Sequence, residues 1–426
     1  MQGWWSITTL FQVEKVLRLV ILIYSIRGTM SSLQDKFTKY LENESIFQNK
    51  DILSNTYHPD DILHREEQID ELASILAPCL KGNDPSNVFV YGTVGTGKTL
   101  VTKHVCDELL NVAETSPSSL DIIYINCKMK KVADTEYRLS AKLARELGAE
   151  VPATGLPTDA VYDRFFEAME EKEGVVIIVL DEIDALVRKI GDDFLYNLTR
   201  INDNLESTKV SLVGISNDLN FVDYIDARVK SSLSEEEIIF PPYDGMELKK
   251  ILKQRCEEGF NDDVIGSGVI SKCAALAASE HGDARRAIDL LRVAGELAER
   301  DEKNKVTTEY VDQAQNKIEK DRVVEAVRNQ PKHSQIILYT IINMDEGEVH
   351  TGDVYKEYQD QARKAGTDPL TQRRISDLIA ELDMLGVINA RVVSKGRYGR
   401  TRKISVDLDS HITKKLSNML EDKFYL

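Results

Sequence analysis

The fold is decided by the stretch Phe89-Val90-Tyr91-Gly92-Thr93-Val94-Gly95-Thr96-Gly97-Lys98-Thr99. It joins an apolar run, Val88–Tyr91, to the pattern G-x-x-x-x-G-K-T, and a helical pattern from Leu100 to Leu110 follows. In a strand, loop and helix of this kind, glycines let consecutive backbone N–H groups turn toward a phosphate. We therefore predict a phosphate-binding loop, in preference to an ordinary glycine-rich turn that closes a strand.

This loop supplies the first candidate ligands. Lys98 is placed to reach the β- and γ-phosphates of a nucleotide, and the Thr99 hydroxyl to bind Mg²⁺. The helix that starts here adds the positive end of its dipole beneath the same phosphates. The nucleotide contacts that the loop predicts are Gly92, Val94, Gly95, Thr96, Gly97, Lys98, Thr99 and Leu100.

Length and composition limit the kind of protein. A chain of 426 residues suggests two or three domains, and 42% apolar with 29% charged residues is typical of a soluble globular protein. The net charge of −17 means that any nucleic-acid contact must come from local basic patches. The five cysteines are odd in number, scattered and without C-x-x-C spacing, which argues for a reducing interior and against structural zinc or a disulfide framework.

Residues 1–29 differ from the rest of the chain. The run Leu19–Tyr24 is strongly apolar and follows Lys15 and Arg18, which resembles the core of a signal peptide. No clear small-x-small cleavage site follows, and the run is far short of a membrane span. Because the composition changes abruptly at Met30, we interpret residues 1–29 as translated upstream sequence. A membrane anchor is the alternative.

A second buried strand carries the acids that phosphate chemistry needs. Val175–Leu180 is continuously apolar, which indicates a strand buried on both faces of a parallel sheet, and it runs into Asp181 and Glu182. We expect Asp181 to hold Mg²⁺ through water and Glu182 to activate the attacking water. The alternative is a solvated acidic strand end. The position about eighty residues after the phosphate loop favours the catalytic interpretation.

Two later segments add candidate polar groups. Ser211–Asn217 has the pattern of a buried strand that ends in an amide. Taken alone, Asn217 is an ordinary turn residue, and its position at a strand end is what suggests a hydrogen bond to the γ-phosphate or the attacking water. Arg228, within Asp226–Leu233, brings a permanently charged guanidinium on a short helix or loop.

The chain then leaves this region through the rigid segment Phe240–Tyr243. Met246–Cys256 is predicted to be a helix, and it carries Arg255. The segment from Gly282 begins another helix, whose N-terminal Arg285 is placed to reach back to a phosphate.

Between residues 57 and 291 these motifs follow the order of one known family. The chain resembles the AAA+ ATPases, and within them the archaeal origin-recognition/cell-division-control initiator family. The motifs are Y-x-P-x-x-x-x-x-R-E, L-D-E-I-D, D-x-R-V-x-S-S-L, P-P-Y with a downstream Arg, and G-D-A-R-R-A-I-D. The Lys128–Gly155 segment is similar to the helical insertion of that family.

The resemblance implies roles for individual residues. It makes Asn217 sensor 1, Arg228 the arginine finger and Arg285 sensor 2. It also implies that the nucleotide is ATP, bound with Mg²⁺ where the core and a helical lid meet. The additional ATP contacts that it implies are Arg65 (within residues 57–66), Tyr243 and Arg255.

The composition changes again after Pro331. Three helical patterns are followed by two short β-runs. Their ranges are His333–Met344, Thr351–Ala365, Thr371–Leu385, Val387–Val393 and Thr401–Val406. Three helices and a basic hairpin resemble a winged helix, which extends the family resemblance to the end of the chain.

The hairpin is the strongest candidate for DNA contact. Gly386–Val406 holds six basic residues and no acid, which in an acidic chain indicates a surface facing phosphates, although a solvated hairpin is the alternative. Arg373 and Arg374 begin the presumed recognition helix, where base edges are within reach. The predicted DNA contacts are Arg373, Arg374, Lys395, Arg397, Arg400 and Arg402, aided by Lys128, Lys130, Lys131, Arg138 and Lys142 of the insertion.

The expected architecture is an α/β fold, a P-loop AAA+ parallel-sheet core with an α-helical lid and a C-terminal winged-helix domain. The expected domains are the extension at 1–29, the nucleotide-binding core at 30–243, the lid at 244–329 and the winged helix at 330–426.

The expected function is that of a replication initiator, an ATPase with slow, switch-like hydrolysis that binds double-stranded origin DNA. The resemblance implies the replicative MCM helicase as a partner, and a related initiator subunit as a further one. We expect a cytoplasmic, nucleoid-associated protein without stable membrane association. Two alternatives stay open: a remodelling or loader ATPase whose winged helix binds protein, and a DNA-bound regulator that uses ATP as a structural ligand.

Overall fold

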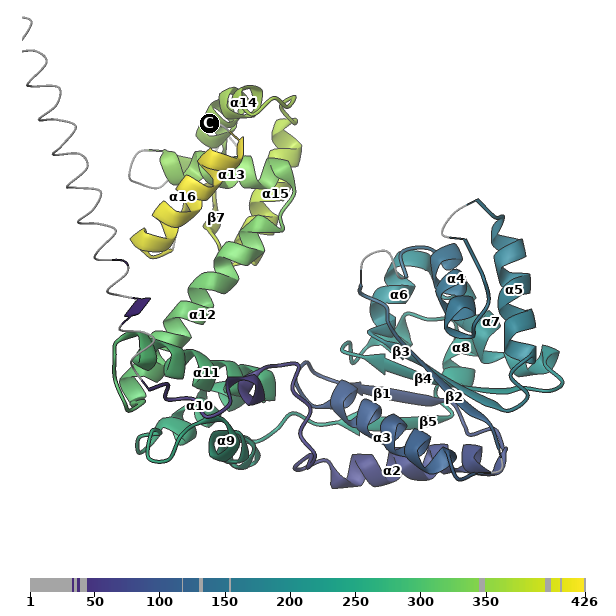
Figure 1. Cartoon of the computed structure of the whole chain (residues 1–426). Coiled ribbons are helices and arrows are strands. Elements are labelled where there is room, and N and C mark those ends of the chain that lie inside the picture. Colours follow the sequence, from purple (N-terminus) through teal and green to yellow (C-terminus); the bar gives the residue numbers. More distant parts are fainter. Residues whose placement is uncertain are drawn as a thin grey trace, which may run out of the picture. The chain divides into compact units, whose positions relative to one another are not determined.

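The computed structural model describes residues 33, 37–38, 44–116, 118–129, 133–152, 155–344, 349–394, 400–406 and 408–424. Residues 1–29 lie outside these ranges, so their interpretation stays a prediction. The chain forms two compact units, Met1–Val311 and Asp312–Leu426, whose elements are drawn in Figure 1. None of the helices in the described ranges combines the length and the apolar composition needed to cross a bilayer.

The first unit is built on a five-stranded parallel sheet in the order β2-β3-β4-β1-β5. Its strands are β1 (Val88–Gly92), β2 (Leu120–Asn126), β3 (Val175–Asp181), β4 (Lys209–Ser216) and β5 (Glu236–Phe240). Every residue of β3 is buried, which confirms the strand predicted to be covered on both faces. Because Tyr91 pairs with Ser216 and Asp181 with Ile215, β1, β3 and β4 end at the same edge.

Helices cover both faces of the sheet (Figure 1). Alternate residues of β3 point to opposite layers, so that Ile177 packs with α2 and α3, and Ile178 packs with the helices of the other face. One layer holds α2 (Glu66–Leu76), the 3₁₀ turn Ala77–Lys81 and α3 (Lys98–Ala113). The other holds α4 (Glu136–Glu146), α5 (Thr158–Glu170), α6 (Ile183–Ile190), α7 (Asp193–Thr199) and α8 (Ala227–Leu233).

A helical lid follows the sheet. Its helices are α9 (Gly245–Gly259), α10 (Val269–Ser279) and α11 (Ala284–Arg300). The segment before the core packs on this lid, because the Phe47 and Phe260 ring centroids lie 4.8 Å apart and the backbone N–H of Gln48 donates to Gly259 O. A Cβ on Gly295 would lie 2.7 Å from the Phe47 ring, so this glycine permits the close approach.

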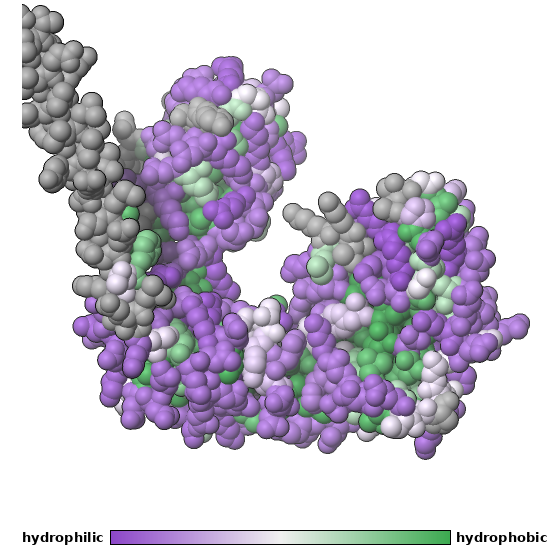
Figure 2. All heavy atoms as spheres, in the orientation of Figure 1, coloured by the Kyte–Doolittle hydropathy of each residue, from purple (hydrophilic) through white to green (hydrophobic). Residues whose placement is uncertain are grey.

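The second unit is a winged helix, as predicted. Its helices are the C-terminal part of α12 (Thr308–Arg328), α13 (Lys332–Asn343), α14 (Thr351–Lys364), α15 (Gln372–Met384) and α16 (Ser410–Phe424). The antiparallel sheet has the order β6-β8-β7, from strands β6 (Val349–His350), β7 (Asn389–Ser394) and β8 (Arg400–Ser405). The hydrophilic residues that cover much of its surface in Figure 2 enclose a core around Tyr358, Ile336 and Leu382.

The Tyr358 hydroxyl joins three parts of this unit. It lies 2.7 Å from His333 Nδ1 on α13, and it accepts a hydrogen bond from the backbone N–H of Leu370, just before α15.

We expect Tyr358→Phe to destabilise the unit by about 1–3 kcal/mol, because two partners lose a buried hydroxyl. Hydrogen exchange of the α13–α15 amides, measured in the full chain, tests this.

Tyr355→Phe is the matched control on the same helix. Its hydroxyl accepts from Gln359 Nε2 at 3.3 Å and is less buried, so we expect a change within about 0.5 kcal/mol. Equal loss of protection in the two variants would contradict the assigned role of the Tyr358 hydroxyl.

Candidate nucleotide site and DNA interface

The phosphate loop lies between the end of β1 and the start of α3, as predicted. Gly95 and Gly97 have φ of 76° and 95°, in the left-handed region that favours glycine. A Cβ on Gly95 would lie 1.7 Å from Asp283 Oδ1, and one on Gly97 would lie 2.9 Å from the Tyr243 hydroxyl. Helix α3 begins directly after Gly97 without a side-chain cap, which leaves its first N–H groups for an anion.

Lys98 is buried at the base of this loop, with 4% of its surface exposed. Its ammonium donates to Gly92 O at 2.9 Å and to Thr93 O at 2.7 Å. Burial lowers the pKa of Lys98 to about 8 from its usual 10.5, an effect to which the nearby Arg285 guanidinium adds and which Asp181 opposes. The Lys98 ammonium therefore lies beneath the loop and loses its proton at a lower pH than an ordinary lysine does.

Thr99 and Asp181 meet across the sheet edge. Thr99 Oγ1 donates to Asp181 Oδ2 at 3.0 Å, and the Tyr124 hydroxyl donates to the same oxygen. Burial, together with the charge of Asp181, raises the pKa of Tyr124, so the phenol keeps its proton and acts as a donor. The two residues predicted to bind Mg²⁺ thus lie in contact, and both offer the oxygen ligands that this ion prefers.

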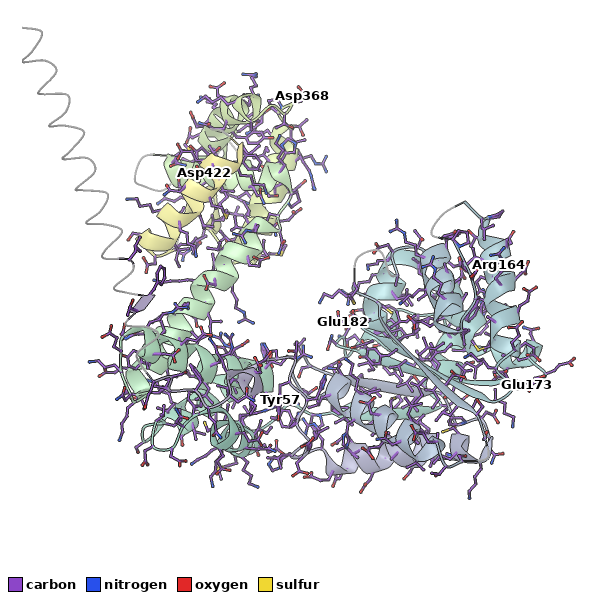
Figure 3. All side chains as sticks on the ribbon, viewed as in Figure 1. Tyr57, Arg164, Glu173, Glu182, Asp368 and Asp422 are labelled. Atoms are coloured by element: carbon purple, nitrogen blue, oxygen red, sulfur yellow. The ribbon has the colours of Figure 1, made fainter. Side chains whose placement is uncertain are left out.

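Glu182 and Asn217 follow the ends of β3 and β4, at the same edge of the sheet as the loop. Glu182 has a φ of 56°, which is strained for a residue with a side chain. Its carboxylate forms an ion pair with Lys128, 3.1 Å away. Figure 3 shows Glu182 at the end of β3, on a different segment from Tyr57, which precedes α2.

A cavity of about 370 Å³ lies beside the loop, between the core and the lid, within the range of ligand pockets. The predicted contacts that line it are Gly95, Gly97, Thr99, Leu100, Tyr243, Arg255 and Arg285. Part of the predicted 57–66 segment lines it as well, namely Tyr57, His58, Pro59, Asp61, Ile62 and Leu63. The structure therefore brings loop, entry segment and lid together around one space.

Arg65 does not line this cavity, although it was predicted to contact the nucleotide. Arg65 is 2% exposed, and its guanidinium donates to the carbonyls of His64, Thr96 and Pro241. It also stacks on the Tyr243 ring at 3.7 Å. In the structure Arg65 holds the loop and the lid entrance in place.

Arg255 lines the cavity and is equally constrained, since it donates to Ile52 O and stacks on the Tyr57 ring at 4.6 Å. Arg285 is exposed at the N-terminus of α11 and faces the cavity. Arg228 does not line it. Its guanidinium is largely exposed, pairs with Asp226 at 3.0 Å and lies over the Tyr196 ring.

Sequence reasoning missed two groups at the site. Lys103 lines the cavity and lies over the Tyr124 ring at 4.8 Å, and its spacing four residues after Thr99 on one helix face was the available signal. Asp283 caps α11, and its carboxylate lies where a Cβ on Gly95 would be. The N–H of Ala284 donates to Gly95 O at 3.2 Å. Such a contact between lid and loop has no local sequence signal.

The predicted DNA contacts are only partly within the described ranges. Arg373 and Arg374 are exposed at the start of α15, and Arg374 lies 3.7 Å from Glu381. Arg402 Nη1 donates to Ser376 O at 2.6 Å, which ties strand β8 to helix α15. Lys395 and Arg397 lie outside the described residues, as does the side chain of Arg400, so these three stay predictions.

The insertion of the core gives a similar picture. Lys130 and Lys131 lie outside the described residues, whereas Arg138 pairs with Asp134 and Lys142 with Glu146.

The charge of the two units differs sharply in the sequence. Residues 312–426 contain 19 Lys and Arg against 18 Asp and Glu, so the whole negative balance lies in residues 1–311. The second unit is thus the part of the chain best suited to a polyanion.

The fold and the loop define an AAA+ type P-loop protein with a helical lid and a winged helix. Three family models match successive parts of the chain: the AAA domain over residues 82–221, the Cdc6 AAA+ ATPase-type lid domain over 249–316, and the CDC6 C terminal winged helix domain over 325–415.

The chain belongs to the family of ORC1-type DNA replication proteins. It is 53% identical to the ORC1-type DNA replication protein of Thermococcus onnurineus over 391 residues, covering 90% of this chain and 94% of that protein. It is 53% identical to ORC1-type DNA replication protein 1 of Methanosarcina mazei, covering 92% and 94%. The structure of the Aeropyrum pernix ORC1 protein in complex with DNA matches with a TM-score of 0.79 at 45% identity, over 90% of this chain and 99% of that chain.

The low pKa of Lys98 predicts a pH dependence for nucleotide binding. The ammonium form attracts phosphate, and its fraction falls as the pH rises through about 8. We expect ATP affinity to weaken above pH 8, by up to about tenfold per pH unit. Calorimetric titration from pH 6.5 to 9.5 measures this.

Lys98→Arg is the control, because its guanidinium stays charged over the whole range. We expect weaker affinity in this variant but no decline above pH 8. A decline of the same slope in both proteins would show that another group titrates.

Proposed function

We propose that this protein is an ATP-dependent replication initiator that recognises origin duplex DNA and recruits the replicative MCM helicase. One observation carries the proposal. In a chain of the ORC1-type family, the sheet register places Lys98, Thr99 and Asp181 at one edge, beside a lid-covered cavity. The same chain carries a winged helix whose α15 begins with two exposed arginines.

The cavity and loop fit ATP with Mg²⁺. A Cβ on Gly95 or Gly97 would collide with a neighbouring side chain, so these positions suit glycine, and the first N–H groups of α3 have no side-chain cap and are available to an anion. Thr99 and Asp181 are the residues that would hold Mg²⁺, which neutralises charge on the transferring phosphate.

The remaining groups have distinct roles in this proposal. Lys98 binds the phosphates, and Glu182 takes a proton from the attacking water. Asn217 orients that water, and Arg285 contributes charge from the lid. Arg228 is exposed and outside the cavity, which suits an arginine finger that acts on a neighbouring subunit, a related initiator.

Glu182→Gln separates binding from hydrolysis. We expect ATP affinity to stay within about threefold, and turnover to fall by about 10²-fold or more, because Gln cannot accept the proton. Binding is measured by calorimetry and turnover by phosphate release on the same preparation. Normal turnover in this variant would remove Glu182 from the mechanism, whereas ATP binding without measurable turnover in the unmodified protein would favour a structural role for the nucleotide.

The winged helix carries the proposed DNA recognition. Helix α15 would lie in the major groove, where arginines hydrogen-bond to guanine edges, while the hairpin residues Arg397 and Arg400 contact the backbone. Origin binding of this kind places the protein at the chromosome in the cytoplasm. Recruitment of the MCM helicase is the step that an origin-bound initiator of this family performs next in our proposal.

Substitution of the two arginine pairs should weaken DNA binding in different ways. Replacing Arg373 and Arg374 by Ala should weaken binding to an origin duplex by about 1–3 kcal/mol per lost base contact, and binding to a scrambled duplex much less. Replacing Arg397 and Arg400 should weaken both duplexes alike and lower the salt slope by about one to two. Salt titrations on both duplexes measure these effects. Unchanged affinities in all four substitutions would favour a winged helix that binds protein.

A further inference from the structure

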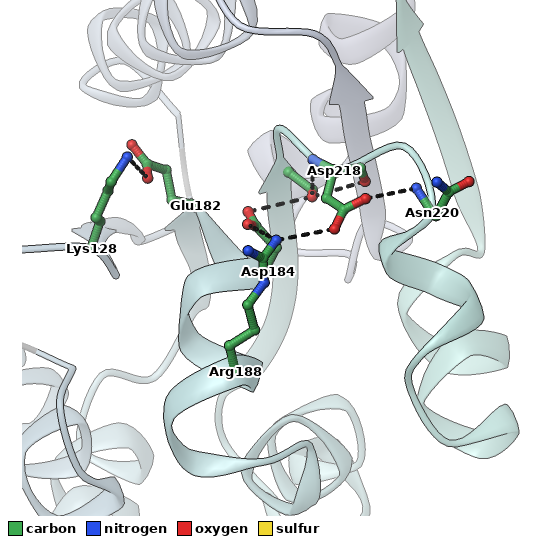
Figure 4. A network of polar contacts seen from close by, with 7 residues as sticks. Lys128, Glu182, Asp184, Arg188, Asp218 and Asn220 are labelled. Atoms are coloured by element: carbon green, nitrogen blue, oxygen red, sulfur yellow. Dashed lines mark hydrogen bonds and ion pairs between the residues drawn. The ribbon is translucent and has the colours of Figure 1, made fainter. Parts of the chain in front are cut away.

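One arginine on α6 joins two carboxylates at the edge of the sheet. Arg188 Nη2 donates to Asp184 Oδ2 at 2.9 Å and to Asp218 Oδ2 at 3.0 Å, as the dashed lines in Figure 4 show. Asp184 lies in the first turn of α6, whereas Asp218 follows the end of β4. The arginine therefore ties the helix that begins directly after Glu182 to the loop that carries Asn217.

The Ser216 hydroxyl adds a second link between the same two elements. It is buried, and it donates its proton to Asp184 Oδ1 at 3.5 Å or to Asp218 O at 3.2 Å. It also accepts from the backbone N–H of Asp218 at 3.0 Å, and Asp218 Oδ1 accepts from the N–H of Asn220 at 3.0 Å. Both neighbours of Asn217 along the chain are therefore held in place.

The two carboxylates can lie this close together because the guanidinium is between them. The side chain of Asp184 is 12% exposed and that of Asp218 is 29% exposed, so water screens their charges only in part. Without the cation, two like charges at this distance repel one another. Loss of Arg188 would therefore push the loop after β4 away from α6, and Asn217 would move with this loop.

The contact with Asp218 distinguishes Arg188 from an ordinary helix-surface arginine. An i, i+4 ion pair such as that with Asp184 stabilises only its own helix, and by a small amount. Asp218 lies 30 residues away along the chain and belongs to another element. The second contact is thus the one that can affect the position of a functional group.

We propose that Arg188 is a positioning residue, which holds the loop after β4 so that Asn217 meets the attacking water. The proposal rests on the function above, since it needs Asn217 to orient that water. The Nη2 atom of Arg188 is engaged by both carboxylates, so the arginine acts through the loop and not by contact with the nucleotide. The consequence is a slower hydrolysis step with unchanged ATP binding.

The first test is single-turnover hydrolysis in Arg188→Ala. We expect the rate to fall by about five- to twentyfold, because a misplaced group slows the chemical step without weakening ground-state binding. ATP affinity, measured by calorimetry, should stay within about twofold. The melting temperature should change little, since exposed ion pairs contribute little to stability. An unchanged rate of hydrolysis overturns the proposal.

The second test shows whether Arg188 acts through Asn217. The rate in Asn217→Ala is the rate that remains without the amide. In the double variant, Arg188→Ala should lower this rate little further, because the group that it positions is already absent. Two effects that multiply in the double variant overturn the proposal.

The third test relieves the charge repulsion. Asp218→Asn removes one of the two carboxylates and keeps an oxygen that accepts from the N–H of Asn220. Added to Arg188→Ala, it should raise the rate of hydrolysis by about threefold or more, since the remaining carboxylate has no like charge opposite it. A rate that stays at the level of Arg188→Ala overturns the proposal.

Arg363→Ala is the matched control. The Arg363 side chain is 65% exposed, as is that of Arg188, and it pairs with Asp360 of its own helix at 3.2 Å. We expect no change in the rate of hydrolysis. A fall equal to that of Arg188→Ala would trace the effect to net charge and overturn the specific role of Arg188.

A fourth measurement does not depend on turnover. The N–H groups of Asp218, Asn220 and Phe221 all donate within the loop after β4. Their hydrogen exchange in the nucleotide-free protein should be faster in Arg188→Ala, while that of α3 should not change. Equal exchange in the loop overturns the proposal.

The outcomes separate this inference from the proposed function. Full turnover in Glu182→Gln contradicts the proposed function. An inactive Glu182→Gln together with an unchanged Arg188→Ala contradicts this inference alone.

Discussion

The arrangement of the nucleotide site depends on one buried cation, Arg65. Its guanidinium donates to carbonyls from three segments: the entry segment at His64, the loop at Thr96 and the exit of the sheet at Pro241. An arginine with 2% exposure is tolerated only where its donors are satisfied and its plane is stacked, and the Tyr243 ring supplies the stacking surface. The loop, the entry segment and the lid entrance are therefore fixed relative to one another before any ligand binds.

Much of the fold could be predicted because its strongest signals are local and periodic. The run at β3 is apolar without interruption, and only a doubly covered parallel strand buries such a run. Strand β5 was missed because it is an edge strand, where Glu236 and Glu237 face solvent and interrupt the apolar pattern. The two-residue strand β6 and the C-terminal helix α16 were not predicted either, since the first is too short for a pattern and the second was outside the motifs considered.

The candidate site was predictable where a sequence motif fixes both the residue type and its position. It was less predictable where the partner of a side chain depends on the tertiary structure. The contact of Thr99 with Asp181 follows from register, because parallel strands end at one edge. The actual partners of Arg65, Arg402 and Lys128 do not follow from a motif. Each of these cations donates to a carbonyl or a carboxylate that no sequence pattern identifies.

The central claim is that ATP and Mg²⁺ bind between the loop and the lid, in a site fixed in advance by Arg65. A crystal structure with Mg²⁺ and a non-hydrolysable ATP analogue tests it most directly. We predict phosphates on the N–H groups of Gly95–Thr99, Mg²⁺ next to Thr99 and Asp181, the base between Tyr57 and the lid, and unchanged hydrogen bonds of Arg65. A nucleotide bound elsewhere, or an Arg65 that leaves its three carbonyls to contact the ligand, would contradict the account.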